Sequence, residues 1–277
     1  MEKDKRVLKL YLIAVSITSA VVAAVWIYFG EQASNAGISA LYMYIPFAVA
    51  FILSKKFYKK QNILGFRFCK PIYIVLAIVI PLAYIGISYI LFWVAAPGSY
   101  TGDFNIFLEF ASAYTQRTGA SVIVISLIIM FISSMVMAFG EEAGWRGFMY
   151  PVMHKLWGRN EALMISGAIW TVWHLPVLLA GLYMSGAVIW YRVPMFIIMV
   201  FAANTIASWL RIKSRSVWPA VIWHASHNYF DQYILSTLTK DVDSVNKAYF
   251  VSETGFITVL LASVIAAFLL IRWKEKE

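Results

Sequence analysis

The sequence predicts an all-α integral membrane protein with eight transmembrane helices and both ends of the chain on the cytoplasmic side. Hydrophobic residues make up 61% of the 277 residues and charged residues only 13%, whereas soluble domains have about 45–50% apolar and about 25% charged residues. The apolar segments reach the length of about 20 residues that a helix needs to cross a bilayer. Basic residues also gather in alternate segments between them, which is typical of a polytopic membrane protein.

Eight segments satisfy the length requirement, and each is bounded by polar or charged residues. The first follows a basic N-terminus, and the second and third flank a lysine-rich loop. The fourth ends in two glutamates, the fifth contains a histidine, the sixth an arginine and the seventh a polar cluster, and the eighth precedes a basic tail. The predicted spans are 8–29, 38–54, 71–96, 119–140, 162–183, 187–210, 217–239 and 254–271.

The distribution of basic residues predicts the orientation of these spans. With the N-terminus inside, the inside segments hold 19 of the 23 Lys and Arg residues. Because such residues stay on the cytoplasmic side, we predict an N-in, C-in protein of the cell membrane. The basic residues behind the net charge of +9 are therefore interpreted as setting the orientation of the protein in the lipid bilayer, and we expect no nucleic-acid partner. The single cysteine, Cys69, excludes an internal disulfide framework, and residues 1–277 are interpreted as one membrane domain.

Ionisable and polar side chains within the spans identify candidate functional residues. A charged residue at the centre of a membrane helix costs roughly 2.5–3.5 kcal/mol on the insertion scale, so each is a functional hypothesis by default. The candidates close the fourth span or lie within the fifth and seventh spans: Glu141, Glu142, His174, His224, His227, Asn228 and Asp231.

Helical spacing divides these residues into groups. Glu142 and Arg146 are four residues apart with the acid first, which favours an ion pair along one helix face. Glu141 lies about 100° around the helix and is free to point elsewhere. On the seventh span, the same spacing of four relates His224 to Asn228 and His227 to Asp231. We expect one of these two pairs to face the site. The other pair is expected to be hydrogen-bonded and to support the site.

This set of side chains suits the hydrolysis of an amide in a poorly hydrated cavity. Glu141, assisted by His174, can take a proton from water. His224 and Asn228 carry N–H donors that can stabilise the oxyanion that forms. The sequence has no HExxH and no GxSxG motif, which argues against the usual zinc and serine mechanisms.

At these residues the chain resembles the CPBP family of intramembrane proteases, which includes type II CAAX prenyl endopeptidases and bacteriocin-processing, Abi-like proteins. Residues 141–146 match EExxxR, His174 lies in the family's FxxxH, and residues 224–228 match HxxxN. One residue departs from the pattern, because Trp170 stands where the family has Phe. We expect this aromatic replacement to leave the chemistry untouched. The resemblance covers residues 119–239, which would form the catalytic core.

The resemblance implies an intramembrane endopeptidase whose site opens toward the cytoplasm. Glu141 and His174 would activate water, His224 and Asn228 would form the oxyanion hole, and Glu142 and Arg146 would support them. No cofactor is implied. The substrate would be a membrane-associated peptide or protein, either prenylated or carrying a leader.

Three alternatives remain open from the sequence. Zinc could bind Glu141, His174 and His224 with a water in the open position. A transporter could use Glu141, His174 and Asp231 as a proton relay. A membrane scaffold or immunity factor could carry the same motifs without cleaving anything.

Overall fold

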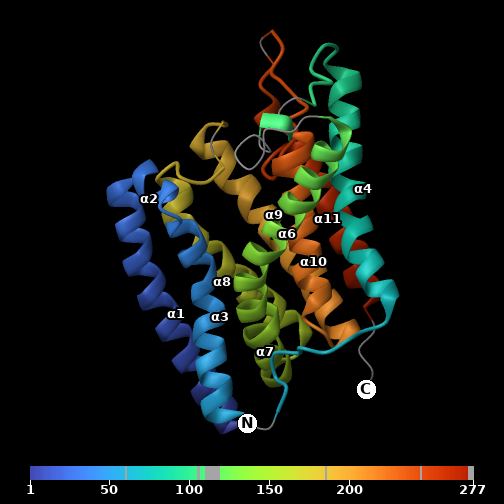
Figure 1. Cartoon of the computed structure of the whole chain (residues 1–277). Helices are drawn as coiled ribbons and strands as arrows, with labels where there is room; N and C mark the ends of the chain where they lie inside the picture. Colours follow the sequence, from blue (N-terminus) through green and yellow to red (C-terminus); the bar gives the residue numbers. More distant parts are fainter. Residues whose placement is uncertain (60, 105–106, 110–118, 185, 244, 274–277) are drawn as a thin grey trace.

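Helices dominate the computed structural model, which describes residues 1–59, 61–104, 107–109, 119–184, 186–243 and 245–273. These residues contain two isolated β-bridges and no strand, which confirms the all-α prediction. The elements, coloured along the chain in Figure 1, are α1 (Glu2–Phe29), α2 (Glu31–Asn35), α3 (Ile38–Phe57), α4 (Pro71–Ala95), α6 (Ala120–Gly144), η1 (Trp145–Met149), α7 (Tyr150–Trp157), α8 (Arg159–Leu179), α9 (Ile189–Ser214), α10 (Trp218–Asn228), η2 (Tyr229–Leu235), η3 (Lys247–Tyr249) and α11 (Phe256–Arg272).

Six helical segments are long and apolar enough to cross a membrane: α1, α3, α4, α6 with its continuation to Trp157, α8 and α9. The two other predicted spans are helical but fall short of that length. α11 has 17 residues, and the predicted seventh span is divided into α10 and the π-helical turn η2. The structure thus confirms a multi-helix membrane protein, while the count of eight spans stays a prediction.

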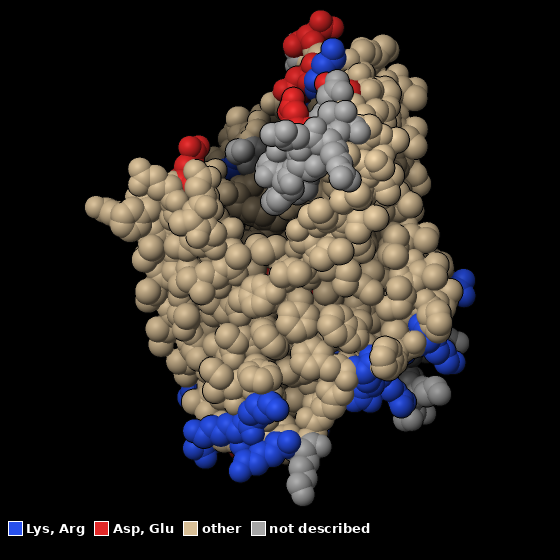
Figure 2. Space-filling model, viewed as in Figure 1, with Lys and Arg blue, Asp and Glu red and all other residues tan. Residues whose placement is uncertain are grey.

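The two ends of the helix bundle differ in charge. α1 begins and α11 ends at the lower end in Figure 1, whereas α2 lies at the upper end. On the face shown in Figure 2, Lys and Arg side chains gather mostly at that lower end. We call it the basic end and the other the α2 end. Four residues of the charge analysis, Lys60, Arg117, Lys274 and Lys276, lie outside the described residues.

Glycines allow α6 to pack closely against α3. A Cβ atom added to Gly144 would lie 2.4 Å from the backbone carbon of Pro46, and one added to Gly140 would lie 2.7 Å from the carbonyl oxygen of Met43. Such small residues let membrane helices approach backbone to backbone. These contacts flank Glu141 and Glu142 and fix the position of both carboxylates along the bundle.

We predict that Gly144→Ala destabilises the protein by about 1–3 kcal/mol, because the added methyl group must push two helix backbones apart. Gly86→Ala in α4 is the matched control, since a Cβ there meets no atom within 4 Å. The readout is the midpoint of thermal unfolding in detergent. Equal midpoints for the two variants would show that the α3–α6 contact does not need a glycine at 144.

Candidate active site

A cavity of about 190 Å³ brings together the four residues predicted to be catalytic. Glu141 comes from α6, His174 from α8, and His224 and Asn228 from α10. The α10 residues are four apart, and both line the cavity as the helical spacing predicted. A site that combines a carboxylate, two imidazoles and an amide therefore forms from segments up to 87 positions apart in the sequence.

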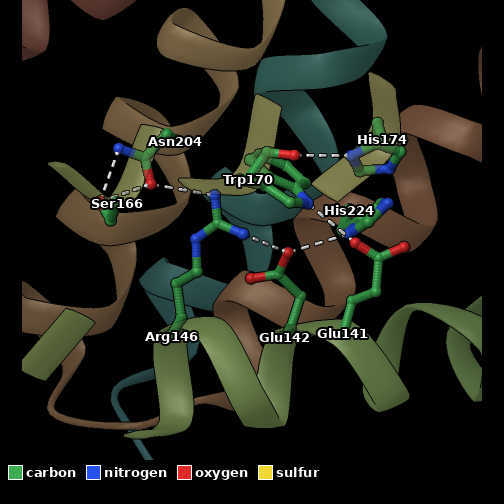
Figure 3. Close-up of polar contacts among 8 residues, drawn as sticks. All are labelled: Glu141, Glu142, Arg146, Ser166, Trp170, His174, Asn204 and His224. Carbon is green, nitrogen blue, oxygen red and sulfur yellow. Dashed lines mark hydrogen bonds and ion pairs between the residues drawn. The ribbon is translucent and has the colours of Figure 1, made fainter. Parts of the chain in front are cut away.

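Glu142 lies beside this cavity at the centre of a buried polar network. Its Oε1 atom accepts hydrogen bonds from Arg146 Nη1 at 2.8 Å and from His224 Nδ1 at 2.9 Å. Arg146 Nη2 donates in turn to Asn204 Oδ1 at 3.2 Å (Figure 3). The predicted Glu142–Arg146 pair is confirmed, and the structure adds that the same carboxylate orients His224.

Glu141 has a hydrogen-bond partner of its own beside that network. Its Oε2 atom accepts the indole N–H of Trp170 at 2.9 Å (Figure 3). Its other oxygen has no donor among the described residues. Glu141 is only 2% exposed, so the free oxygen is held in a poorly hydrated place. A carboxylate with one fixed and one free oxygen can accept a proton from a water molecule in the cavity.

His174 is fixed by the same tryptophan. Its Nδ1 atom lies 3.0 Å from the carbonyl oxygen of Trp170. Because a carbonyl only accepts hydrogen bonds, His174 must carry a proton on Nδ1. In a neutral ring this leaves Nε2 as the acceptor, which is the form that can bind or deprotonate water.

The model of the family described as "Type II CAAX prenyl endopeptidase Rce1-like" matches residues 121–230. All three motifs named above lie in this range. We call residues 121–230, the segment that is similar to this family, the CPBP core. The chain is also 23% identical over 142 residues to "CAAX prenyl protease 2" of Methanococcus maripaludis. That alignment covers 50% of this chain and 48% of the relative, so the chain spans about half the length of the curated relative it matches.

Within this CPBP core, Trp170 does more than the sequence suggested. The expectation that Trp170 would leave the chemistry untouched rested on its aromatic ring alone, whereas its indole N–H also donates to Glu141. The Arg146 guanidinium also lies 3.9 Å from the centre of the ring. A phenylalanine could keep the cation–π contact with Arg146 but has no N–H to donate. The departure from the family motif therefore adds a hydrogen bond to Glu141.

His227 and Asp231 lie beside the CPBP site, but they do not form the pair that was predicted. Tyr84 and Tyr89 of α4 hydrogen-bond to them separately, Tyr84 to His227 at 2.6 Å and Tyr89 to Asp231 at 2.9 Å. The helix changes to a π-helix at Tyr229. Because π-helices hydrogen-bond from i to i+5, residues four apart no longer lie above one another. Each side chain therefore bonds to α4 instead.

The cavity of the CPBP core lies toward the α2 end. Its lining includes Trp26 near the end of α1, Ser39 at the start of α3 and Tyr233 in η2, and Figure 2 shows a hollow in that end. On the basic side of Glu142, Trp145 and Arg146 are at most 1% exposed and close the site. The lining of this cavity thus extends toward the end of the bundle opposite to the basic end.

The sequence did not identify several residues that complete the CPBP site. Asn204 is a polar residue within a predicted span and could have been singled out on that ground; it binds Arg146 and accepts a hydrogen bond from Ser166 at 3.2 Å. Tyr183 and Glu253 lie outside the family motifs, and no sequence signal marks them. Among the described residues, no group of three His, Cys, Asp or Glu side chains is arranged to hold a metal ion.

Proposed function

We propose that this chain is an intramembrane endopeptidase that hydrolyses a peptide bond of a membrane-associated peptide or protein. The observation that carries the proposal is the shared cavity of Glu141, His174, His224 and Asn228 within a CPBP core. The family match and the relative with the name of a CAAX prenyl protease support a protease. Residues 1–277 would form one membrane domain around the 119–239 core.

Glu141 and His174 would activate the attacking water. The water oxygen bonds to the carbonyl carbon of the substrate while its proton passes to the free oxygen of Glu141. His174 Nε2 would hold the water, since Nδ1 is occupied by the Trp170 carbonyl. When the carbon–nitrogen bond breaks, Glu141 returns the proton to the leaving nitrogen, which balances the reaction without a cofactor.

His224 and Asn228 would stabilise the oxyanion formed by this attack. A His224 ring that carries both protons donates Nδ1–H to Glu142 and presents Nε2–H to the cavity. Asn228 adds an amide N–H from one helical turn further along. Arg146 holds Glu142 in place, so the ion pair would act as the support of the oxyanion hole.

Comparing peptide termini across the membrane proteomes of cells that carry the wild type or Glu141→Gln tests this proposal. Termini that are present only with the wild type would identify both the activity and the substrate. Identical profiles, with both proteins folded and equally abundant, would contradict the protease and favour a scaffold.

The Trp170 hydrogen bond to Glu141 leads to a kinetic prediction. A hydrogen bond to a charged group contributes about 1.5–3 kcal/mol, so we expect Trp170→Phe to lower kcat about tenfold or more while KM changes little. Steady-state cleavage of the substrate found above measures this. Trp223→Phe is the control, because the indole N–H of Trp223 has no partner among the described residues. An equal loss in both variants would assign the effect to packing.

We further propose eight spans with the N- and C-termini inside and, in consequence, a site that opens to the extracytoplasmic side. The basic residues support the orientation, and the cavity lies at the end opposite to them. This replaces the cytoplasmic opening expected from the sequence. The substrate segment would accordingly reach Glu141 from the outer half of the membrane.

Thiol labelling checks the orientation. In a Cys69→Ser background, Ala36→Cys places a thiol at the α2 end and Lys56→Cys places one at the basic end; both positions are exposed. A membrane-impermeant maleimide should label only Ala36→Cys in intact cells and both variants after permeabilisation. The opposite pattern would restore the cytoplasmic opening and reject the N-in orientation.

A further inference from the structure

A second, much smaller chamber lies beside the open cavity. Its volume of about 20 Å³ is enough for one water molecule, which needs at least about 10–15 Å³ and two to four polar partners. His174, Tyr183 and His224 line both the open cavity and this chamber, so they form the wall between them. His227 and Glu253 are the remaining polar residues of its lining.

Glu253 is a buried carboxylate that the proposed mechanism does not use. It lies between η3 and α11, outside the matched family segment, and is 8% exposed. Its Oε2 atom accepts the Tyr183 hydroxyl at 2.9 Å and lies 4.0 Å from His227 Nε2. The latter distance is too long for a direct hydrogen bond and suits a bridging water. The other ring nitrogen of His227 is bonded to Tyr84.

Tyr183 connects Glu253 to the site. The Tyr183 ring stacks on His174 with ring centres 5.4 Å apart and an interplanar angle of 28°. Its hydroxyl donates to Glu253, so the carboxylate sets the position of the ring that packs against His174. A charged acceptor makes this hydrogen bond stronger than a neutral one would.

We propose that Glu253 is a positioning residue of the active site. With His227 it binds one water in the small chamber, and through this water and Tyr183 its carboxylate keeps His174 and His224 in their working orientation. The inference rests on the proposed function, which assigns those two histidines to water activation and oxyanion binding.

The surroundings of Glu253 place its ionisation in the neutral range. Burial, followed by the charge of Asp231, raises the pKa of Glu253 to about 7, while the Tyr183 hydrogen bond and His224 oppose that rise. The ionised carboxylate only accepts hydrogen bonds and accepts them more strongly, whereas the protonated group carries an O–H donor, so positioning should improve as the pH rises through 7. The titratable groups around Glu253 and its chamber come from five parts of the chain: Tyr84 and Tyr89, Glu141, His174 and Tyr183, His224 and His227, and Asp231.

The pH dependence of kcat/KM for the wild type and Glu253→Gln tests the proposal. At about pH 8.5 we expect the variant to be at least about tenfold slower. At about pH 5.5 the two should converge, because the wild-type carboxyl group is then protonated and resembles an amide. Glu31→Gln, which removes an exposed carboxylate at the same end, should keep the wild-type profile. A loss that is constant across the pH range, or no loss, would overturn the proposal.

Infrared difference spectroscopy separates this inference from the proposed function. A protonated carboxyl band that disappears with a midpoint near the pKa of about 7 should be present in the wild type and in Glu141→Gln, and absent in Glu253→Gln. This band does not depend on turnover. If the band is present but no cleavage is detected, the protease proposal fails, while the titration of the buried Glu253 carboxyl group is still supported. If no band is lost in Glu253→Gln, Glu253 does not titrate in the chamber and the inference is wrong.

Discussion

Glu141→Gln is expected to lower turnover by at least about a thousandfold while the protein still folds. Loss of a general base typically costs about 10²–10⁴-fold. Glutamine keeps the size of the side chain, and its carbonyl can still accept the Trp170 indole N–H. It cannot take the proton of the attacking water. Initial rates on the substrate found by terminus profiling measure the loss, and thermal unfolding in detergent checks the fold.

Glu161→Gln is the matched control for this substitution. Glu161 is an exposed carboxylate in the first turn of α8, and we expect its removal to leave activity at the wild-type level. If Glu141→Gln retains activity within about tenfold of the wild type, a loss smaller than general-base removal usually gives, Glu141 is not the base. His174 would then be the remaining candidate for that function.

Arg146→Met is expected to destabilise the protein by about 3–5 kcal/mol, because it removes one partner of a buried ion pair and leaves an uncompensated charge. The Glu142 side chain is 0% exposed and that of Arg146 1% exposed. Arg146 also carries the hydrogen bond to Asn204. Thermal or denaturant unfolding in detergent measures the change.

Two variants test whether the uncompensated Glu142 charge causes that loss. The double variant Glu142→Gln, Arg146→Met removes the charge as well and should recover part of the stability. Lys5→Met breaks an exposed pair with Glu2, which should cost at most about 1 kcal/mol. If the double variant is no more stable than Arg146→Met alone, the loss arises from packing around the guanidinium.

Interactions within one helix were the part of the site that the sequence could predict. The Glu142–Arg146 pair and the shared face of His224 and Asn228 follow from a spacing of four residues, and both are present. The same rule failed at Asp231, where the helix becomes a π-helix and shifts the register. A spacing rule holds only where the helix type that it assumes continues.

Contacts between helices could not be read from the sequence. His224 bonds to Glu142 from a position 82 residues away, and Trp170 bonds to Glu141 from 29 residues away. The motifs contain these residues but do not indicate which of them bond to each other, because the pairing depends on which helix faces pack together. The Gly140 and Gly144 contacts with α3 contribute to that packing, and their effect appears only in three dimensions.

The sequence by itself determined the membrane-embedded helical class, the family that the core resembles and the candidate residues for its chemistry, because length, hydropathy and short motifs are local properties of the chain. The tertiary structure decided what those residues touch: the tryptophan that holds both Glu141 and His174, the separate tyrosine partners of His227 and Asp231, and the chamber completed by Glu253. It also decided that the cavity lies at the end opposite to the basic residues. The direction of an opening depends on how the helical segments pack together, and no single segment contains that information.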